Sequence, residues 1–320
     1  MPPERSRGTL LPSLPADVLA RIAALVDNVL ALRATCRSLR AHVRPPARVT
    51  RAAMLRTPAL AAWAWELRGF RSRAFFPFEQ GTLCALASST GSERTLAWLR
   101  ERDCAWDFRT CSAAAGSGHL ATLRWARERG CEWDSGTCEA AAGGGHLVVL
   151  EWARRHGCEW SRETCAAAAR GGHLAVLQWA REHGCEWDSR TCEAAAGGGH
   201  AAVLEWAREH GCAWDSRTCW AAAGGGHLAV LQWAHEHGCD WDSGTCSAAA
   251  GGGHLALLRW AREHGCEWDK STCEAAARGG HLDVLQWARA SGCAWDRNGC
   301  WVRAECRGHA HVVAWLRAHR

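Results

Sequence analysis

The 320-residue sequence lacks any long uninterrupted run of apolar residues, which excludes a membrane-spanning helix. The stretch from Met1 to Gly8 is polar and no apolar segment follows it, so we expect no secretory signal peptide. From these absences we expect a soluble, intracellular protein with no membrane partner.

An excess of positive charge is missing beyond the N-terminal quarter of the chain. The first 80 residues hold 13 arginines and five acidic residues, a net charge of +8. Because the whole chain has a net charge of +5, residues 81–320 carry a net charge of −3. Nucleic-acid binding needs concentrated cations, and a weakly acidic remainder argues against it. We therefore expect no nucleic acid among the partners.

A period of 27 residues organises most of the chain. "TCEAAAGGGHAAVLEWAREHGCAWD" begins at Thr191, and "TCWAAAGGGHLAVLQWAHEHGCDWD" begins at Thr218. The same frame places a cysteine at nine positions: Cys84, Cys111, Cys138, Cys165, Cys192, Cys219, Cys246, Cys273 and Cys300. A fixed period of this length is typical of stacked repeats. The sequence therefore predicts about nine copies of one structural element.

Each repeat is predicted to contain two short helices, as residues 188 to 212 illustrate. Asp188 and Thr191 are residues of the N-cap type ahead of the Ala-rich first helix, which ends at the glycines 197 to 199. Apolar residues then recur at helical spacing in a second helix, namely Ala201, Leu204 and Ala207, with Val203 and Trp206 widening the stripe. Gly211 occupies the position of a C′ glycine.

Helices this short are marginal alone and must bury their apolar faces against their neighbours. The predicted fold is therefore all-α, with an α-solenoid over residues 82–320 in which alanine allows close packing and Leu, Val and Trp supply buried area. Residues 44–81 are expected to form a linker and helical cap, and residues 1–10 a disordered N-terminus.

The chemistry-bearing residues recur with the period. Of 19 cysteines, 17 fall at two fixed repeat positions, and we expect reduced thiols. No C-x-x-C pair exists, and the histidine of His210-Gly211-Cys212 is replaced by Arg129 or Ser291 elsewhere, so no metal site is expected. The histidine after the glycines is expected to cap the turn by hydrogen bonding.

The recurring Gly-Gly-Gly-His turn resembles a phosphate loop only superficially. A nucleotide-binding loop requires a lysine and a hydroxyl group after its glycines, and the only lysine of the chain is Lys270. A catalytic site needs groups unique to one place, whereas every candidate Cys, His and Asp is periodic. We therefore expect no cofactor, no catalytic residue and no enzyme activity.

Positions that vary between repeats are the candidates for binding. The residue after the first-helix cysteine is Ser112, Glu139, Ala166, Glu193, Trp220, Ser247, Glu274 and Trp301 in successive repeats. An additional tryptophan on a short helix is a plausible anchor for a partner. The charged and aromatic members are our predicted partner-binding residues: Glu139, Glu193, Trp220, Glu274 and Trp301.

The order T-C-x-A-A-A-x-G-G-H-L-x-V-L-x-W resembles a shortened ankyrin repeat. Cysteine replaces the usual proline after the threonine, and the 33-residue ankyrin period is reduced to 27. Repeats of this degenerate kind are similar to the large ankyrin-like families of giant DNA viruses, the pandoraviruses among them. The resemblance covers roughly residues 82 to 320 and implies a protein-binding solenoid that acts in a host cytoplasm.

Residues 11–43, "LPSLPADVLARIAALVDNVLALRATCRSLRAHV", resemble an F-box. The segment between Asp27 and Cys36 is about two residues shorter than usual, and leucine stands where many family members have tryptophan. The resemblance implies binding to the Skp-family adaptor of a cullin-based ubiquitin ligase, with the solenoid presenting an unknown target protein. It assigns adaptor contacts to Leu14, Pro15, Val18, Leu19, Ile22, Leu25, Cys36, Arg37 and Leu39.

An alternative remains open for the same N-terminal segment. Its apolar residues also fit two helices that only cap the solenoid. The protein would then be a scaffold or sequestering protein with no ligase partner.

Overall fold

A computed structural model of the chain describes residues 80–319. The predicted segments 1–10 and 11–43, and nearly all of the predicted linker 44–81, lie outside these residues. Every regular element from residue 80 to residue 319 is an α-helix, in agreement with the predicted all-α class. In this part of the chain no helix has both the length and the apolar character needed to cross a membrane.

The chain divides into two compact units, Met1–Trp133 and Asp134–Arg320. The described part of the first unit holds two helix pairs: α6 (Gln80–Ser89) with α7 (Glu93–Arg100), and α8 (Phe108–Gly116) with α9 (Leu120–Glu128). The second unit holds seven pairs: α10 (Ser135–Gly143) with α11 (Leu147–Arg155), α12 (Arg162–Arg170) with α13 (Leu174–Glu182), α14 (Ser189–Gly197) with α15 (Ala201–Glu209), α16 (Ser216–Gly225) with α17 (Leu228–Glu236), α18 (Ser243–Gly252) with α19 (Leu255–Glu263), α20 (Lys270–Gly279) with α21 (Leu282–Ala290), and α22 (Arg297–Cys306) with α23 (Ala310–Ala318). The predicted number of repeats and their helix-turn-helix design are confirmed.

The first helix of a pair begins at an aspartate. In α14 the side chain of Asp188 accepts a hydrogen bond from the backbone N–H of Arg190, which satisfies one of the free donors at the helix start. Thr191, the other residue of the N-cap type, lies inside α14 and is fully buried. The cap is therefore Asp188 alone, and in α12 Ser161 takes its place.

The second helix ends at a glycine in the left-handed conformation. Gly211 has φ +82° just beyond α15, as predicted for a C′ residue. Val203, Leu204 and Ala207 form the buried stripe of α15. Trp206 remains half-buried, because its indole packs on the surface of the helix layer rather than inside it.

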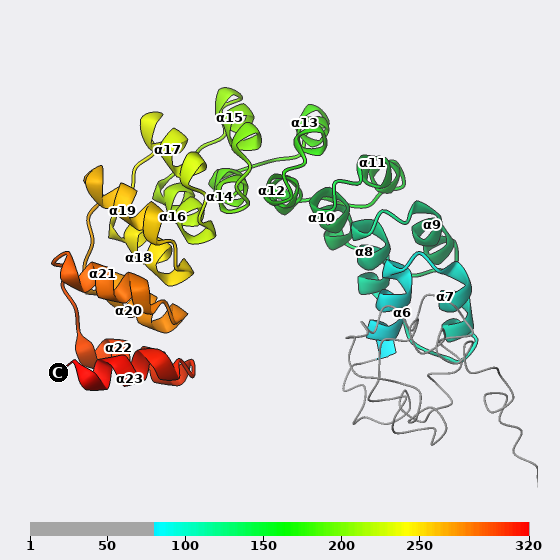
Figure 1. The fold of residues 1–320 in the computed structure, drawn as a ribbon. Helices are drawn as coiled ribbons and strands as arrows, with labels where there is room; N and C mark the ends of the chain where they lie inside the picture. Colours follow the sequence, from blue (N-terminus) through cyan, green and yellow to red (C-terminus); the bar gives the residue numbers. More distant parts are fainter. Residues whose placement is uncertain (1–79, 320) are drawn as a thin grey trace, which may run out of the picture. The chain divides into compact units, whose positions relative to one another are not determined.

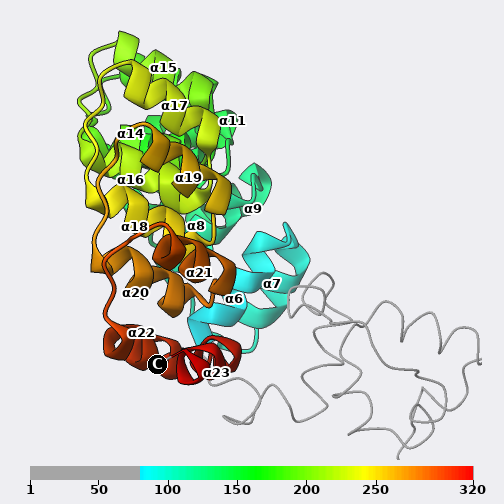
Figure 2. The ribbon, with the colours of Figure 1, turned by 60° about the vertical axis from the view of Figure 1, so that its left-hand side comes forward.

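The second unit is built in two layers. Figures 1 and 2 show its first helices side by side in one layer and its second helices in the other. Alanine pairs such as Ala195 and Ala196 are fully buried between first helices, which allows their close approach. One leucine per repeat, Leu204 in α15, is completely buried and contributes about 1.5–3 kcal/mol.

The histidine after the glycine turn links neighbouring repeats. Nε2 of His227 lies 3.1 Å from the carbonyl oxygen of Gly197, at the end of the preceding first helix. The histidine also precedes α17, yet its side chain makes no capping bond to that helix. The predicted hydrogen bond is present, but it holds the preceding repeat and not the histidine's own turn.

Arginine and tryptophan fix the loop that returns from the second helix. Nη1 of Arg208 donates to the carbonyl oxygen of Cys212 at 2.6 Å, and its guanidinium lies 4.1 Å from the ring centroid of Trp214. The Trp214 ring then meets Trp233 of the next repeat edge to face, with centroids 5.8 Å apart. Such tryptophan pairs recur in successive repeats and form a ladder that joins each loop to the following second helix.

Candidate protein-binding surface

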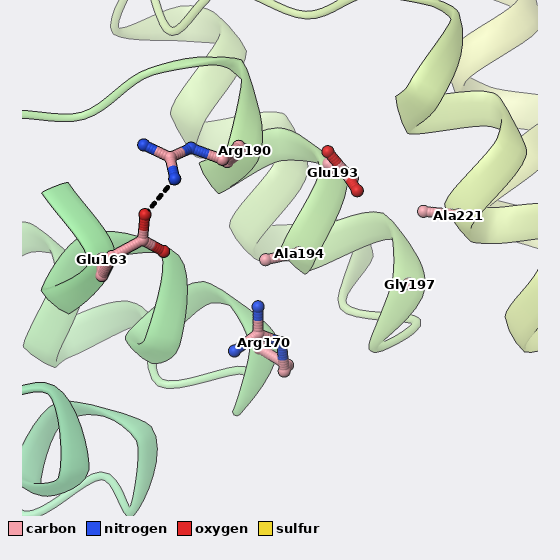
Figure 3. A pocket seen from close by; sticks show the side chains of 7 residues that line it. All are labelled: Glu163, Arg170, Arg190, Glu193, Ala194, Gly197 and Ala221. Carbon is pink, nitrogen blue, oxygen red and sulfur yellow. Dashed lines mark ion pairs between the residues drawn. The ribbon is translucent and has the colours of Figure 1, made fainter.

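The exposed side of the first helices in the second unit carries several variable positions, and we call it the first-helix face. Four repeat positions form it: the residue two before the helix cysteine and those one, two and five after it. A pocket of about 290 Å³ on this face shows which residues meet there (Figure 3). Its lining comes from three consecutive first helices and comprises Glu163, Arg170, Arg190, Glu193, Ala194, Gly197 and Ala221.

The floor of this pocket is small and apolar, whereas its walls are charged. Ala194, Gly197 and Ala221 leave the backbone of α14 and α16 close to the surface. On one wall, Arg190 of α14 forms an ion pair with Glu163 of α12, drawn as a dashed line in Figure 3. The pocket can therefore accept an apolar group between polar neighbours.

Arg190 is also tied to its own helix cap. Its Nη2 lies 2.9 Å from Oδ2 of Asp188. The side-chain hydrogen bond from Arg190 holds the pKa of the Asp188 carboxyl below its usual range, and the backbone N–H of Arg190 acts in the same direction. Arg190 thus has two carboxylate partners within the repeat stack.

Arg170 differs from the other arginine of the pocket. It is the exposed last residue of α12, and its guanidinium points into the pocket below Ala194 (Figure 3). Within residues 80–319 the structure gives this guanidinium no ion pair and no hydrogen bond. It is therefore available to a ligand.

Two of the predicted partner-binding residues are engaged inside the stack. Oε1 of Glu139 accepts a hydrogen bond of 3.0 Å from the hydroxyl of Ser161 in the next repeat. Glu274 forms an ion pair of 2.8 Å with Arg303 of α22, and its side chain is only 14% exposed. Both carboxylates join adjacent repeats, so their variation follows that of their neighbours in the stack.

The other three predicted residues are more accessible. Glu193 lines the pocket, and Trp220 on α16 is 48% exposed. Trp301 is half-buried, because its Nε1–H donates to Glu305 at 2.8 Å and the Arg317 guanidinium lies 4.8 Å from its ring centroid. Of the large hydrophobic residues in the described part of the second unit, only Val148, Trp220 and Val302 are exposed.

The sequence interpretation missed Glu163, Arg170, Arg190 and Ala221. The signal for Arg170 was present, because first helices carry glycine at this position in Gly143, Gly197, Gly224 and Gly251. Arg278 breaks the pattern in the same way on α20. A search of every variable repeat position would have found both arginines.

The cysteines are structural. All 18 cysteines of the described residues are free thiols, and all but Cys306 are buried. The thiol of Cys239 donates to the carbonyl oxygen of Asp215 at 3.4 Å, which ties the return loop to the start of its repeat. The hydrogen bond with Cys239 and then burial raise the pKa of Cys219, so this thiol is kept protonated.

Residues 80–319 contain no group of three or more His, Cys, Asp or Glu side chains arranged to hold a metal ion. A second pocket, of about 400 Å³, lies on the second helices and is lined by Glu205, Arg208, Glu209, Trp214, Trp233 and His237. Its aromatic and arginine residues already form the ladder that fixes the loops. The predicted adaptor-binding residues, Leu14 to Leu39, lie outside the described part of the chain.

The described helix pairs define an all-α repeat solenoid. No protein-family model matches the chain, and no curated protein matches it. Among solved structures it is similar to the ankyrin repeat domain of human ASB11, with a TM-score of 0.39 and 17% sequence identity. That similarity covers 49% of this chain and 83% of the ASB11 chain.

Proposed function

We propose that this chain binds another protein through the first-helix face of its second unit. The exposure of Trp220 carries the proposal. At the same repeat position Glu139 and Glu274 are held by adjacent repeats and Trp301 by its own repeat, whereas the Trp220 side chain stands 48% exposed on α16. Exposed tryptophans are favoured anchors in protein interfaces, since they bury a large area at little entropic cost.

The layer behind this surface is rigid, which suits a binding platform. The helix cores are packed with fully buried alanine and leucine, and the bonds from His200, His227 and His254 each join a repeat to the one before it. A partner would therefore meet helices already held in place, and binding would cost little ordering of the solenoid backbone.

The test compares three full-length proteins in quantitative affinity capture from eukaryotic cell lysate. Trp220→Glu restores the residue found at Glu139, Glu193 and Glu274, so the repeat keeps its own sequence pattern. Val148→Ala is the matched control, because it removes another exposed apolar side chain, on second helix α11. We expect a set of proteins to be captured equally by the wild type and the control. The captured amount of these proteins should fall by about tenfold or more with Trp220→Glu. Equal capture by all three proteins would refute the proposal.

The ligase link is a separate part of the proposal and is supported by sequence alone. The F-box-like pattern from Leu14 to Leu39 would bind a Skp-family adaptor, and the solenoid would then present its target for ubiquitin transfer. We expect Leu19→Asp to lose the adaptor and cullin while keeping the target, and Trp220→Glu to do the reverse. Absence of adaptor from the wild-type capture would leave the scaffold alternative.

Deletion of residues 1–43 distinguishes that alternative further. If these residues only cap the array, the solenoid should lose stability when they are removed, because a terminal repeat would expose its apolar face. If they form an adaptor-binding module, the free energy of unfolding of the solenoid should be unchanged.

A further inference from the structure

The first-helix face carries two unpartnered arginines at equivalent places. Arg170 ends α12 and Arg278 occupies the same repeat position on α20, four repeats later. Both side chains are exposed, and within residues 80–319 neither guanidinium has an ion pair or a hydrogen bond. The three first helices between them have glycine at this position: Gly197, Gly224 and Gly251.

Trp220 lies on α16, which is the middle one of the five first helices α12, α14, α16, α18 and α20. In each of these five helices the residue after the Trp220 position is an alanine. Ala194 of α14 and Ala221 of α16 line the pocket floor. The residues that break the repeat pattern thus follow one another along one face: the cation Arg170 on α12, the exposed indole of Trp220 on α16 and the cation Arg278 on α20. Small residues separate them.

The remaining arginines of this face are neutralised within the stack. Arg190 pairs with Glu163 and Asp188, and Nη2 of Arg217 lies 2.8 Å from Oδ2 of Asp215. Glu193 has no ion pair within residues 80–319. The pKa values of Arg190 and Arg217 are raised mainly by their hydrogen bonds with Asp188 and Asp215, and also by the charge of Glu193. The charges left for a partner on α12 and α20 are therefore positive.

We infer that the first-helix face recognises an acidic segment of its protein partner. Carboxylates of the segment pair with Arg170 and Arg278, and an apolar side chain between them packs against Trp220 and the alanine floor. This inference rests on the proposed function and adds the chemistry of the partner. Arginine suits the role because its planar fork binds a carboxylate through two parallel hydrogen bonds.

A nucleic acid would also supply negative charge, but the face does not favour it. Only two unpartnered arginines and Lys270 occur on the first helices from α12 to α20, and strong phosphate binding needs many more contacts. An exposed indole between two separated cations fits an alternation of acidic and apolar side chains.

The test uses a random peptide display library selected on the full-length protein. Trp220→Glu serves as the counter-selection, so that only peptides that need the indole are kept. We expect the wild type to enrich peptides with Asp or Glu on both sides of an apolar or aromatic residue. The best synthetic peptide is then measured by fluorescence anisotropy against the wild type and the arginine variants.

The variants Arg170→Gly and Arg278→Gly are matched to the chain itself, because glycine stands at this position in four other first helices of the second unit. We expect each variant to reduce the affinity for the acidic peptide by about tenfold, and the double variant to reduce it further. The double charge reversal Arg170→Glu with Arg278→Glu should turn the selection toward Lys- and Arg-rich peptides. Loss of packing alone would not produce that reversal.

The outcomes separate the two proposals. Enriched peptides that need Trp220 but show no acidic preference, or affinities unchanged in both arginine variants, overturn the acidic-segment inference and leave protein binding in place. Tight binding of a single-stranded DNA oligonucleotide that competes with the peptide also overturns it. If no selected peptide and no captured protein depends on Trp220, the proposed function itself fails.

Discussion

His235 lies flat against Trp241, with ring centroids 3.8 Å apart and an interplanar angle of 15°. The equivalent residue in the preceding repeat is Arg208, which covers Trp214 and also donates to the carbonyl oxygen of Cys212. Within residues 80–319 no hydrogen bond joins His235 to the carbonyl of Cys239. The repeat that contains α17 thus keeps the ring contact of the ladder but lacks its arginine hydrogen bond.

His235→Arg should therefore stabilise the second unit by about 0.5–1.5 kcal/mol, since it adds a charge-assisted bond to the loop carbonyl and places a cation over Trp241. Urea unfolding and amide hydrogen exchange in the loop after α17 would measure the gain. The reverse change, Arg208→His, serves as the control and should destabilise its own loop by a similar amount. A His235→Arg protein no more stable than the wild type would contradict this account.

The residues that begin and end the helices of each repeat were sufficient to predict the fold. Aspartate before the first helix and glycine after the second act through local backbone geometry, so Asp188 and Gly211 could be assigned from sequence alone. The buried face of the second helix was also predictable, because Leu204 and Ala207 recur at helical spacing and both are buried. Thr191 was ambiguous, since a threonine near a helix start can cap or be buried.

The binding surface could be predicted only in part. Variation after the helix cysteine identified Glu193 and Trp220, but it also selected Glu139 and Glu274, whose partners lie in the next repeat. A periodic sequence shows that a position varies without showing which side chain it meets across the stack. Arg170 was visible in the sequence as a break in the glycine pattern, but its place beside Glu193 and Ala194 of the neighbouring helix was not.

Two glycines at the end of α16 should respond to alanine in opposite directions. A Cβ at Gly224 would lie 3.7 Å from the Cβ of Ala248, an ordinary contact, and the residue is helical. Gly224→Ala should stabilise the protein by about 0.4–1 kcal/mol through loss of unfolded-state entropy.

Gly226 has φ +76°, and a Cβ there would lie 2.5 Å from Cε1 of His254. Gly226→Ala should destabilise by about 1–3 kcal/mol, because it combines backbone strain with a clash against the histidine that links the repeats. Urea midpoints of the two variants measured under one set of conditions provide the comparison. Equal shifts of the same sign would show that the turn tolerates a side chain.

The cap of α16 should contribute stability that depends on pH. The hydrogen bond from the Arg217 side chain, followed by that from its backbone N–H, lowers the pKa of Asp215 from its ordinary value of 3.8. A lowered pKa in the folded state means that the contribution is fully present above pH 3.8. It is lost as the pH falls through the lower, folded-state pKa.

Asp215→Ala should cost about 0.5–2 kcal/mol at neutral pH, because it removes the cap. Asp215→Asn is the matched variant, since an amide oxygen still caps the helix while the titrating charge is gone. The difference in unfolding free energy between wild type and Asp215→Asn should be constant above pH 3.8 and should decrease below it. A difference that does not change with acidification would show that the ion pair with Arg217 adds nothing.

The cysteine thiols should divide into two classes by their rate of reaction with a thiol reagent, one fast and one protected. Burial raises the pKa of Cys84 to about 12 and that of Cys300 to about 12, so neither presents a thiolate near neutral pH. Cys306 is exposed at the end of α22. Because Cys36 lies outside the described residues, the experiment uses a Cys36→Ser background.

In that background, Ellman's reagent should label one thiol rapidly in the native protein and all the others only in denaturant. Cys306→Ser should abolish the fast phase and leave the total otherwise unchanged, which assigns the reactive group. A denatured total below the cysteine count would reveal disulfides and refute the free-thiol assignment. Several fast thiols in the native protein would mean that repeats open locally, since the buried cysteines lie behind the layer of packed alanines.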